Sequence, residues 1–328
     1  MGIIKERRKL NKAIRNAKTI FLMAHKNLDL DALGSQIGMN MILKRKKKKV
    51  YIIIDDRTHE MGVEKVLREL EGCIDLIRSE EVEDYLYPRQ SKNLLIILDT
   101  NKTELVQSEE VLSKIRNKLI IDHHDTGKST ISDAEMIIDT KTSSTCEMIA
   151  NLIEYYDVEL ESYYATIILS GIVLDTNNYT LNTNAETYYT SYYLASLGAS
   201  AKKVQYLLKQ NIEDYAERQK LLASIETLEG NVAFTKATPY TQYRREDLAK
   251  VADTLLFFNN IEASFVIGKT GKDTIGVSAR SLGNYDISSI LEKLGGGGDA
   301  TSGAATFENT TISKVEQEVK KCIKEEGE

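Results

Sequence analysis

The chain has no tryptophan, 2 prolines and 3 cysteines among its 328 residues. So little proline, and no serine-rich tract, argues against a long disordered linker. The cysteines lie far apart and form no C-x-x-C pair, so they cannot all be paired within the chain and do not have the spacing of a thiolate zinc site. We expect them to be reduced thiols in the core or at the surface.

Long apolar runs are also missing. No stretch approaches the length of a membrane span, and the N-terminus lacks the apolar core of a signal peptide. These features predict a cytoplasmic location. The formal net charge is −6, which disfavours long nucleic acid as a partner because such proteins usually present a basic face. One basic run, residues 44–49, ends a predicted helix and should favour its dipole; attraction of a membrane surface or a nucleotide is the alternative.

The first half of the chain alternates between two patterns. Runs rich in Ile, Leu and Val predict strands buried on both faces at 19–24, 50–54, 94–98, 118–121 and 135–138. Helical spacing lies between and after them, at 31–43, 62–70, 80–86, 109–115 and 144–156. This alternation predicts the α/β class, with a parallel sheet and helices on both of its faces.

The second half is mixed. Helical spacing continues at 161–173, 185–197, 202–209 and 212–228. The tyrosine pairs in this region fit helix packing better than base stacking. A smaller α/β pattern follows: strands at 231–237, 263–269, 274–280 and 304–307, with helices at 245–258 and 286–294 and a final helix, after the last strand, that runs through Lys324. We predict a first domain at 1–211, a connecting helix at 212–228 and a second domain at 229–328.

Imidazoles and carboxylates follow the predicted strands. His25, Asp29 and Asp31 follow the first strand, and their spacing in a loop lets them converge on one point. Asp31 could instead cap the helix it begins, but capping does not explain His25 or Asp29. Asp99 ends a later strand, and the run Asp122, His123, His124 ends the next. Because ligands bind beyond the carboxyl ends of parallel strands, these clusters predict one shared site.

Asp175 adds a further carboxylate. It ends an apolar helix, where an acid is unfavourable against the helix dipole unless something compensates it. Asp29, Asp31, Asp99 and Asp175 carry four negative charges, which would balance two divalent cations. Oxygen and imidazole ligands without thiolate favour Mn²⁺ or Mg²⁺. Two such ions can activate a bridging water and clamp a phosphoryl group.

These motifs resemble those of a known superfamily. The series His25-x-Asn27-x-Asp29-x-Asp31, Asp99, Asp122-His123-His124 and Asp175 is similar, in residue type and order, to the motifs of DHH phosphoesterases. The second half resembles the accompanying DHHA1 domain, in the segments 252–256, 262–268, 278–283 and 295–298. Together, from about Thr19 to the final helix, the chain resembles the catalytic half of the GdpP-type cyclic-di-AMP phosphodiesterases of bacteria.

The resemblance implies an activity and a cofactor. That family hydrolyses cyclic di-AMP to linear pApA with Mn²⁺, two ions per active site, for which Mg²⁺ or Co²⁺ can substitute. Carried over by position, His25, Asp29 and Asp99 would hold one ion. The second ion would be held by Asp31, Asp99, His123 and Asp175, with Asp99 shared between the two.

The resemblance also implies supporting roles. Asp122 would orient a ligand, and His124 would contact the phosphate or assist proton transfer. Contacts to the non-scissile phosphate or the nucleotide would come from the second domain, at Ser278, Arg280, Gly296, Gly297, Gly298 and position 299. Family members are usually larger, with membrane-anchoring and sensory segments, and a homodimer is implied.

Two positions depart from the family pattern. Asp299 stands where the family has histidine after the glycines, and an aspartate would repel a phosphate unless protonated or metal-bound. Asn101 stands where relatives often carry histidine. These departures leave two alternatives open: cleavage of linear dinucleotides, short RNA or pAp, and a cyclic-dinucleotide-binding module with little turnover. Polyphosphate hydrolysis fits less well, because those relatives carry a different second domain.

Overall fold

A computed structural model describes residues 2–55, 59–298 and 300–327. The chain divides into two compact units, Met1–Lys209 and Gln210–Glu328. Within the described ranges, no helix combines the length and the apolar character needed to cross a membrane.

The first unit is built on a six-stranded sheet in the order β3-β2-β1-β4-β5-β6. Every pair of neighbours is parallel. Its strands are β1 (Thr19–Met23), β2 (Lys49–Ile53), β3 (Leu76–Ile77), β4 (Asn93–Leu98), β5 (Lys118–Asp122) and β6 (Glu135–Ile138). The predicted parallel sheet is confirmed. β3 was not predicted, because two residues carry no readable pattern.

The strand order reverses beside β1. β2 and β3 lie on one side of it, while β4, β5 and β6 lie on the other. The chain therefore crosses over in one direction along the sheet from β1 to β2. It crosses over in the opposite direction from β4 to β5. A crevice opens at the carboxyl ends of β1 and β4 as a result, and open α/β sheets bind ligands at such switch points.

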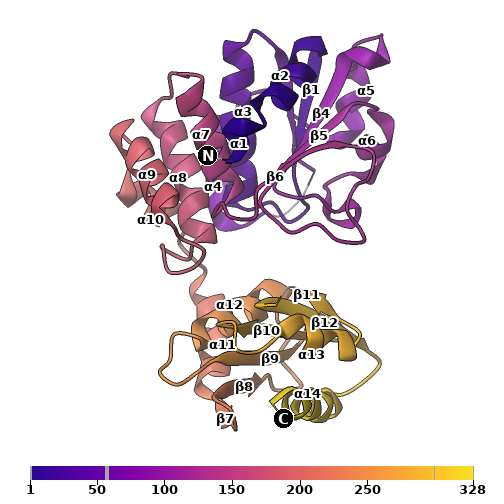
Figure 1. Ribbon diagram of the computed structural model, residues 1–328, viewed down its shortest axis with the longest axis vertical. Helices are drawn as coiled ribbons and strands as arrows, with labels where there is room; N and C mark the ends of the chain where they lie inside the picture. Colours follow the sequence, from indigo (N-terminus) through magenta and orange to yellow (C-terminus); the bar gives the residue numbers. More distant parts are fainter. Residues whose placement is uncertain (1, 56–58, 299, 328) are drawn as a thin grey trace. The chain divides into compact units, whose positions relative to one another are not determined.

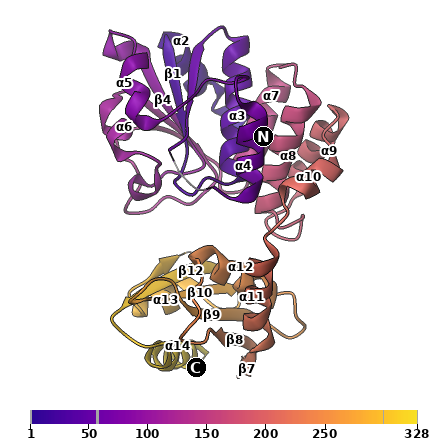
Figure 2. The same ribbon diagram turned by 180° about the vertical axis from the view of Figure 1, so that it is seen from behind.

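Helices cover both faces of this sheet (Figures 1 and 2). Alternate side chains of β1 point to opposite sides: Ile20 and Leu22 join the larger core with α3, α7 and α8, while Phe21 and Met23 join the smaller core beside α5 and α6. The helices are α1 (Gly2–Lys5), α2 (Arg7–Asn16), α3 (Leu30–Arg45), α4 (Met61–Leu70), α5 (Val82–Tyr85), α6 (Glu109–Lys114), α7 (Thr145–Tyr155), α8 (Ser162–Asp175), α9 (Ala185–Ser196) and α10 (Ala201–Leu207). Burial on both faces explains why the strand sequences are apolar throughout.

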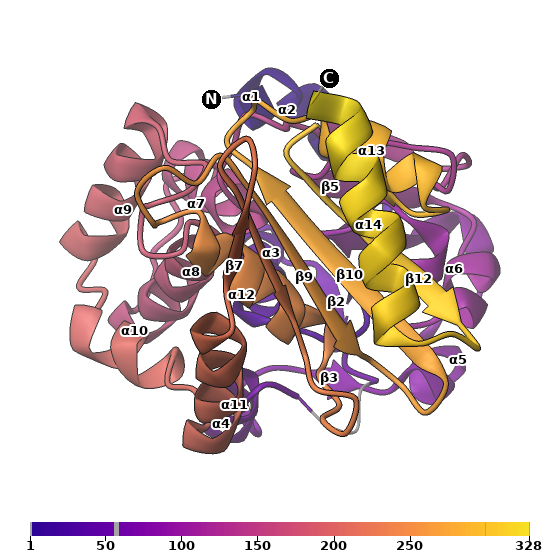
Figure 3. The same ribbon diagram turned by 90° about the horizontal axis from the view of Figure 1, so that it is seen from below.

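The second unit has its own six-stranded sheet, in the order β11-β12-β10-β9-β8-β7. Its strands are β7 (Glu226–Leu228), β8 (Val232–Lys236), β9 (Ala263–Lys269), β10 (Thr274–Ser281), β11 (Gly297–Gly298) and β12 (Ser302–Glu308). Its helices are α11 (Ile212–Ala223), α12 (Arg245–Leu255), α13 (Ile287–Lys293) and α14 (Ile312–Gly327). α13 and α14 cover one face of the sheet, as Figure 3 shows, and α11 and α12 pack on the other. The predicted hairpin of β9 and β10 is confirmed.

The connecting helix predicted at 212–228 is wrong in its last turn. α11 ends at Ala223, and Glu226–Leu228 forms the edge strand β7, antiparallel to β8. The apolar spacing continues past Ala223, but antiparallel pairing with β8, the next strand in the chain, overrides the local helical preference. α11 also packs on α12, so it belongs to the second unit.

Candidate metal centre

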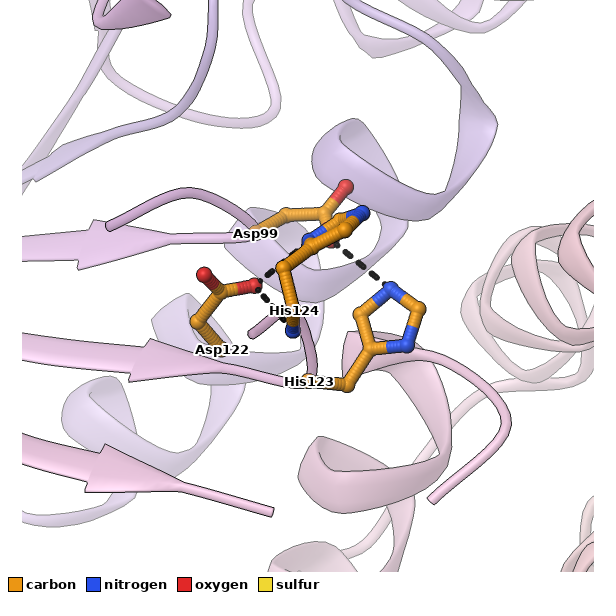
Figure 4. A group of neighbouring side chains, drawn as sticks. All are labelled: Asp99, Asp122, His123 and His124. Carbon is orange, nitrogen blue, oxygen red and sulfur yellow. Dashed lines mark hydrogen bonds and ion pairs between the residues drawn. The ribbon is translucent and has the colours of Figure 1, made fainter. Parts of the chain in front are cut away.

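The sequence-predicted ligands of the first unit converge at the switch point. His25 follows β1, Asp99 directly follows β4, Asp122 ends β5, and Asp175 ends α8. Their ligand atoms fall into three overlapping groups, each with all atoms within 4.8 Å of one another. The groups are His25, Asp29 and Asp99; Asp31, His123 and Asp175; and Asp99, Asp122, His123 and His124. Figure 4 shows the third, with all four side chains turned toward one another.

Asp29 both caps a helix and faces the cluster. It is the N-cap of α3, and its Oδ1 accepts from the backbone N–H groups of Asp31 and Ala32, each at 2.9 Å. Its Oδ2 lies 3.6 Å from His25 Nε2. The capping alternative considered for Asp31 is therefore wrong: the cap is Asp29, which uses one oxygen for it and turns the other toward the imidazole.

Asp31 is held by the start of another helix. Its Oδ2 accepts from the backbone N–H of Thr145 and its Oδ1 from that of Cys146, both at 2.8 Å. These are first-turn amides of α7, where the helix dipole favours an anion. Asp31 is fully buried, and this pair of donors fixes the direction of its carboxylate.

Asp99 is the most constrained residue of the cluster. Its φ is 62°, a left-handed conformation that is strained for a non-glycine residue and is retained mainly at functional sites. Its Oδ1 accepts from Thr145 Oγ1 at 2.9 Å and lies 3.5 Å from His123 Nε2. Its Oδ2 lies 3.4 Å from His25 Nε2. Asp99 therefore touches both imidazoles that the sequence predicts as ligands.

His123 gives the test of whether the residues fit a metal. Its Nε2 is buried and makes no hydrogen bond to any described residue. The same atom lies 3.2 Å from Asp175 Oδ2 and 3.5 Å from Asp99 Oδ1, without hydrogen-bond geometry to either. An imidazole nitrogen surrounded by carboxylate oxygens but not bonded to them is the arrangement expected around a divalent cation. These donor atoms therefore fit a divalent metal ion.

Asp122 holds His124 by two contacts. Its Oδ1 lies 2.8 Å from His124 Nδ1 and accepts from the backbone N–H of His124 at 3.2 Å. Asn101 steadies the other oxygen, since its Nδ2 donates to Asp122 Oδ2 at 2.7 Å. Asn101 also donates to the carbonyl of His124 and accepts from Thr130. The asparagine that departs from the family pattern is thus built into the support of this histidine.

Burial and neighbouring charges raise the pKa values of four residues of the cluster. Burial raises the pKa of Asp31 well above its ordinary range, and the negative charge of Asp99 adds to this effect. Burial raises the pKa of Asp175 to about 6, against the opposing effect of His123. Burial alone would lower the pKa values of His25 and His123, but the neighbouring carboxylates hold both well above their ordinary value. Large pKa shifts of this kind are typical of functional sites.

These shifts predict a steep pH dependence of metal affinity. Each ligand binds a cation only when it is deprotonated. A raised pKa means that the proton still competes near neutral pH, and this applies to His25, His123, Asp31 and Asp175. We expect Mn²⁺ affinity to fall by about ten-fold or more between about pH 8 and about pH 6, with protons released on binding. Calorimetric titration in buffers of different ionisation enthalpy measures both; an affinity that does not change with pH would contradict the shifts.

A cavity of about 250 Å³ opens above the cluster. Cluster residues form part of its lining, together with Asn101, Lys102 and Leu105. Lys102 is the one lysine or arginine among the described residues lining it. Sequence reasoning missed both Lys102 and Thr145. Each lies within a few positions of a strand or helix end without forming a motif, so neither carried a signal of its own.

Two of the predicted phosphate contacts, Ser278 and Arg280, lie on β10 of the second unit. Arg280, on β10, donates from Nε to Asp253 Oδ1 at 2.6 Å and from Nη1 to its neighbour's carbonyl, Ala279 O, at 2.9 Å. Ser278 lies on the same face of β10 and is buried. Burial raises the pKa of Asp253, although Arg280 opposes the shift. Asp253 thus fixes one edge of the guanidinium that the sequence predicts as a phosphate contact.

The glycine run has a structural reason. A Cβ on Gly296 would lie 2.4 Å from the carbonyl oxygen of Ala304, and one on Gly298 would lie 2.1 Å from that of Ser302. β11 therefore pairs with β12 at a distance that side chains would prevent. A Cβ on Gly297 would meet no other atom within 4 Å. The close approach predicted for this run is made to the chain's own strand, and phosphate binding here stays a prediction. Asp299 lies outside the described residues.

Comparisons with known proteins agree with this geometry. Residues 19–172 match the model of the DHH family, N-terminal domain, and residues 229–325 match the DHHA1 domain. The chain belongs to the DHH family. It is 34% identical over 318 residues to the cyclic-di-AMP phosphodiesterase GdpP of Geobacillus thermodenitrificans, and 32% identical over 318 residues to the cyclic-di-AMP phosphodiesterase PdeA of Listeria monocytogenes serotype 1/2a. Each match covers 96% of this chain and 48% of the relative, so the chain spans about half the length of these curated relatives.

A solved structure shows the same fold. An exopolyphosphatase-related protein from Bacteroides fragilis superimposes with a TM-score of 0.78 at 21% identity, covering 98% of this chain and 97% of the other. At this identity the likeness concerns the fold alone. The resemblance stated from the motifs is therefore confirmed at the level of the DHH and DHHA1 domains, and the chain is a DHH-family protein with a cluster of carboxylates and imidazoles able to hold metal.

Proposed function

We propose that this DHH protein is a metal-dependent phosphodiesterase that hydrolyses cyclic di-AMP to linear pApA. The observation that carries the proposal is the cluster at the switch point, where three imidazoles and five carboxylates meet beside a cavity of about 250 Å³. The similarity to two cyclic-di-AMP phosphodiesterases over 96% of this chain supports the choice of substrate. The proposal includes Mn²⁺ as the resident ion and a homodimer as the assembly.

The ligands divide into two overlapping sets. His25, Asp29 and Asp99 would hold one cation, and Asp31, His123 and Asp175 would hold the second together with Asp99. Bound divalent cations would lower the pKa of a nearby water and neutralise charge on the phosphate. Asp99 is suited to the shared position, because its two oxygens face different imidazoles.

Side chains beside the metal ligands would orient the substrate and attract its phosphate. Asp122 occupies Nδ1 of His124, which leaves Nε2 to contact a phosphate oxygen or to give a proton to the leaving oxygen. His124 is half exposed and lines the cavity, so it is accessible to a bound substrate. Lys102, at the same cavity, would attract the phosphate without competing for the metal ligands.

In the second unit, Arg280 would contact the phosphate that is not cleaved. Asp253 holds its Nε edge in place, which limits the rotamer entropy lost when the guanidinium takes up an anion. Ser278 and the backbone of Gly297 are proposed as further contacts.

The direct test separates products by chromatography after incubation with cyclic di-AMP and Mn²⁺. We expect pApA as the product, and no product when the metal is chelated. Linear pApA and short RNA are assayed in parallel at the same concentrations. A strong preference for the linear substrates would replace the proposed substrate, and tight binding of cyclic di-AMP without turnover at any metal concentration would show a binding module instead.

A further inference from the structure

A dense group of cations lies at the end of the first unit's sheet where the strands begin. α2 ends just before β1, and both ribbon views place it beside the start of that strand (Figures 1 and 2). The end of α3 and the start of β2 join it there. We call this surface the basic patch; it comprises Arg8, Arg15, Lys18, Lys44, Arg45, Lys46, Lys47, Lys48 and Lys49.

Contacts between the two segments show that the patch is continuous. Lys48 Nζ donates to the carbonyl of Ala17 at 2.8 Å and to that of Arg15 at 3.3 Å. Lys46 Nζ donates to Asn11 Oδ1 on α2 at 3.4 Å. Burial lowers the pKa of Lys48, and the positive charges of Lys18 and Lys92 lower it further. Residues far apart in the sequence are thus packed closely enough to repel one another.

Carboxylates do not balance this charge. In the described part of the chain, no member of the basic patch forms an ion pair, whereas the neighbouring Lys9 and Lys12 on α2 pair with Glu6 and Glu135. The chain as a whole is acidic, with a net charge of −6. A concentration of unpaired cations in an acidic protein raises the free energy of the folded state through self-repulsion, and an anionic partner would compensate it.

Tyrosines adjoin the basic patch. Tyr156 donates from its hydroxyl to Asn11, and Lys46 Nζ lies 3.9 Å from the centroid of its ring. Tyr155 beside it is 49% exposed and has Arg7 5.7 Å from its ring centroid. Tyr189, on α9, donates from its hydroxyl to Glu154 on α7 and is 46% exposed. Exposed tyrosines beside a lysine-rich surface are typical of the interface between water and lipid.

From this combination we propose that the basic patch and its flanking tyrosines dock the first unit on an anionic phospholipid surface. Clusters of Lys and Arg of this size attract anionic headgroups through their charge. The patch lies at the amino ends of the strands and the metal cluster at their carboxyl ends. A strand of five residues spans roughly 16 Å, so a docked protein would keep its cavity turned away from the lipid.

Nucleic acid is a less suitable partner for this surface. Bases bind to single-stranded-nucleic-acid proteins by stacking on open aromatic faces. Here cations already lie over the rings of Tyr155 and Tyr156. The patch is also mostly lysine, which binds as a point charge and lacks the planar fork with which arginine recognises phosphates and bases.

The test is co-sedimentation with vesicles. The whole chain is mixed with vesicles of phosphatidylcholine alone, or of phosphatidylcholine with phosphatidylglycerol. The patch variant replaces four exposed members, Lys44, Arg45, Lys47 and Lys49, with glutamine. The control variant makes the same change of charge at four exposed lysines elsewhere, Lys141, Lys202, Lys209 and Lys272. Circular dichroism checks that both variants fold, and single-stranded RNA binding is measured by fluorescence anisotropy.

We expect binding to anionic vesicles only, weakened about ten-fold or more by the patch variant, unchanged by the control variant and lost at high salt. Absence of binding to anionic vesicles, equal binding to neutral ones, or an equal loss in the control variant would each overturn the proposal. RNA binding that only the patch variant loses, without vesicle binding, would assign the surface to nucleic acid instead. None of these readouts depends on catalysis.

Discussion

Replacing Asp99 with asparagine is expected to abolish turnover and metal binding together. Asp99 is proposed to serve both cations, and its two oxygens lie 3.4 Å from His25 Nε2 and 3.5 Å from His123 Nε2. Loss of a shared ligand removes several kcal/mol of transition-state stabilisation, which corresponds to a fall in kcat of about 1000-fold or more. The measurement is kcat on cyclic di-AMP together with the Mn²⁺ content of the dialysed protein.

The matched control is Asp84→Asn, which makes the same chemical change at an exposed position of α5 in the same unit. It should keep both activity and metal content. The amide oxygen of an asparagine in place of Asp99 can still accept from Thr145, so the fold should persist, and circular dichroism shows whether it does. An Asp99→Asn protein that still held its full complement of metal would contradict the shared-ligand role.

Replacing His124 with alanine should instead separate turnover from metal binding. His124 is half exposed, and its Nδ1 is occupied by Asp122, so it is proposed to act on the substrate through Nε2. Loss of a positioned proton donor or phosphate contact lowers kcat by about 100-fold to about 10,000-fold. The measurements are kcat, KM and Mn²⁺ content.

His123→Ala provides the comparison, because the two histidines are neighbours with different surroundings. His123 Nε2 is buried among carboxylate oxygens, and its loss should reduce metal content as well as kcat. If His124→Ala lost metal to the same degree as His123→Ala, His124 would also be a ligand, and the proposed division of roles between the two would be contradicted.

Much of the first unit can be read from the sequence because burial on both faces imposes a strong pattern. The strands β1, β4 and β5 are apolar at nearly every position, and the structure places each within one residue of its predicted start and end. Since parallel strands have their carboxyl ends at one edge, the polar residues that follow them must share that edge. The meeting of His25, Asp99 and His123 follows from this reasoning.

What supports the cluster could not be read in the same way. The hydroxyl of Thr145 donates to Asp99 and its backbone N–H donates to Asp31, 114 positions earlier in the chain. Asn101 braces Asp122, and both contacts depend on the packing of separate elements. Threonine and asparagine occur in many loops and helix starts, so their types gave no signal. The cap of α3 was misplaced by two residues for a related reason, since both Asp29 and Asp31 are favourable N-cap residues.

The second unit shows a different limit. The hairpin of β9 and β10 was readable from its turn, but residues 224–228 continued a helical spacing into what is an edge strand. The glycine run predicted close backbone approach, and Gly296 and Gly298 do require it, although the approach is to β12. The glycines thus predicted that the backbone approaches another group closely, but they did not show that this group is the neighbouring strand β12.

The central claim is that the acidic and imidazole groups of the first unit hold two cations. The most direct measurement is the metal stoichiometry of the protein after equilibration with Mn²⁺, combined with anomalous scattering from a crystal. We predict two ions per chain, both held in part by Asp99. A protein that binds no Mn²⁺, or binds it away from His25, Asp99 and His123, would contradict the account.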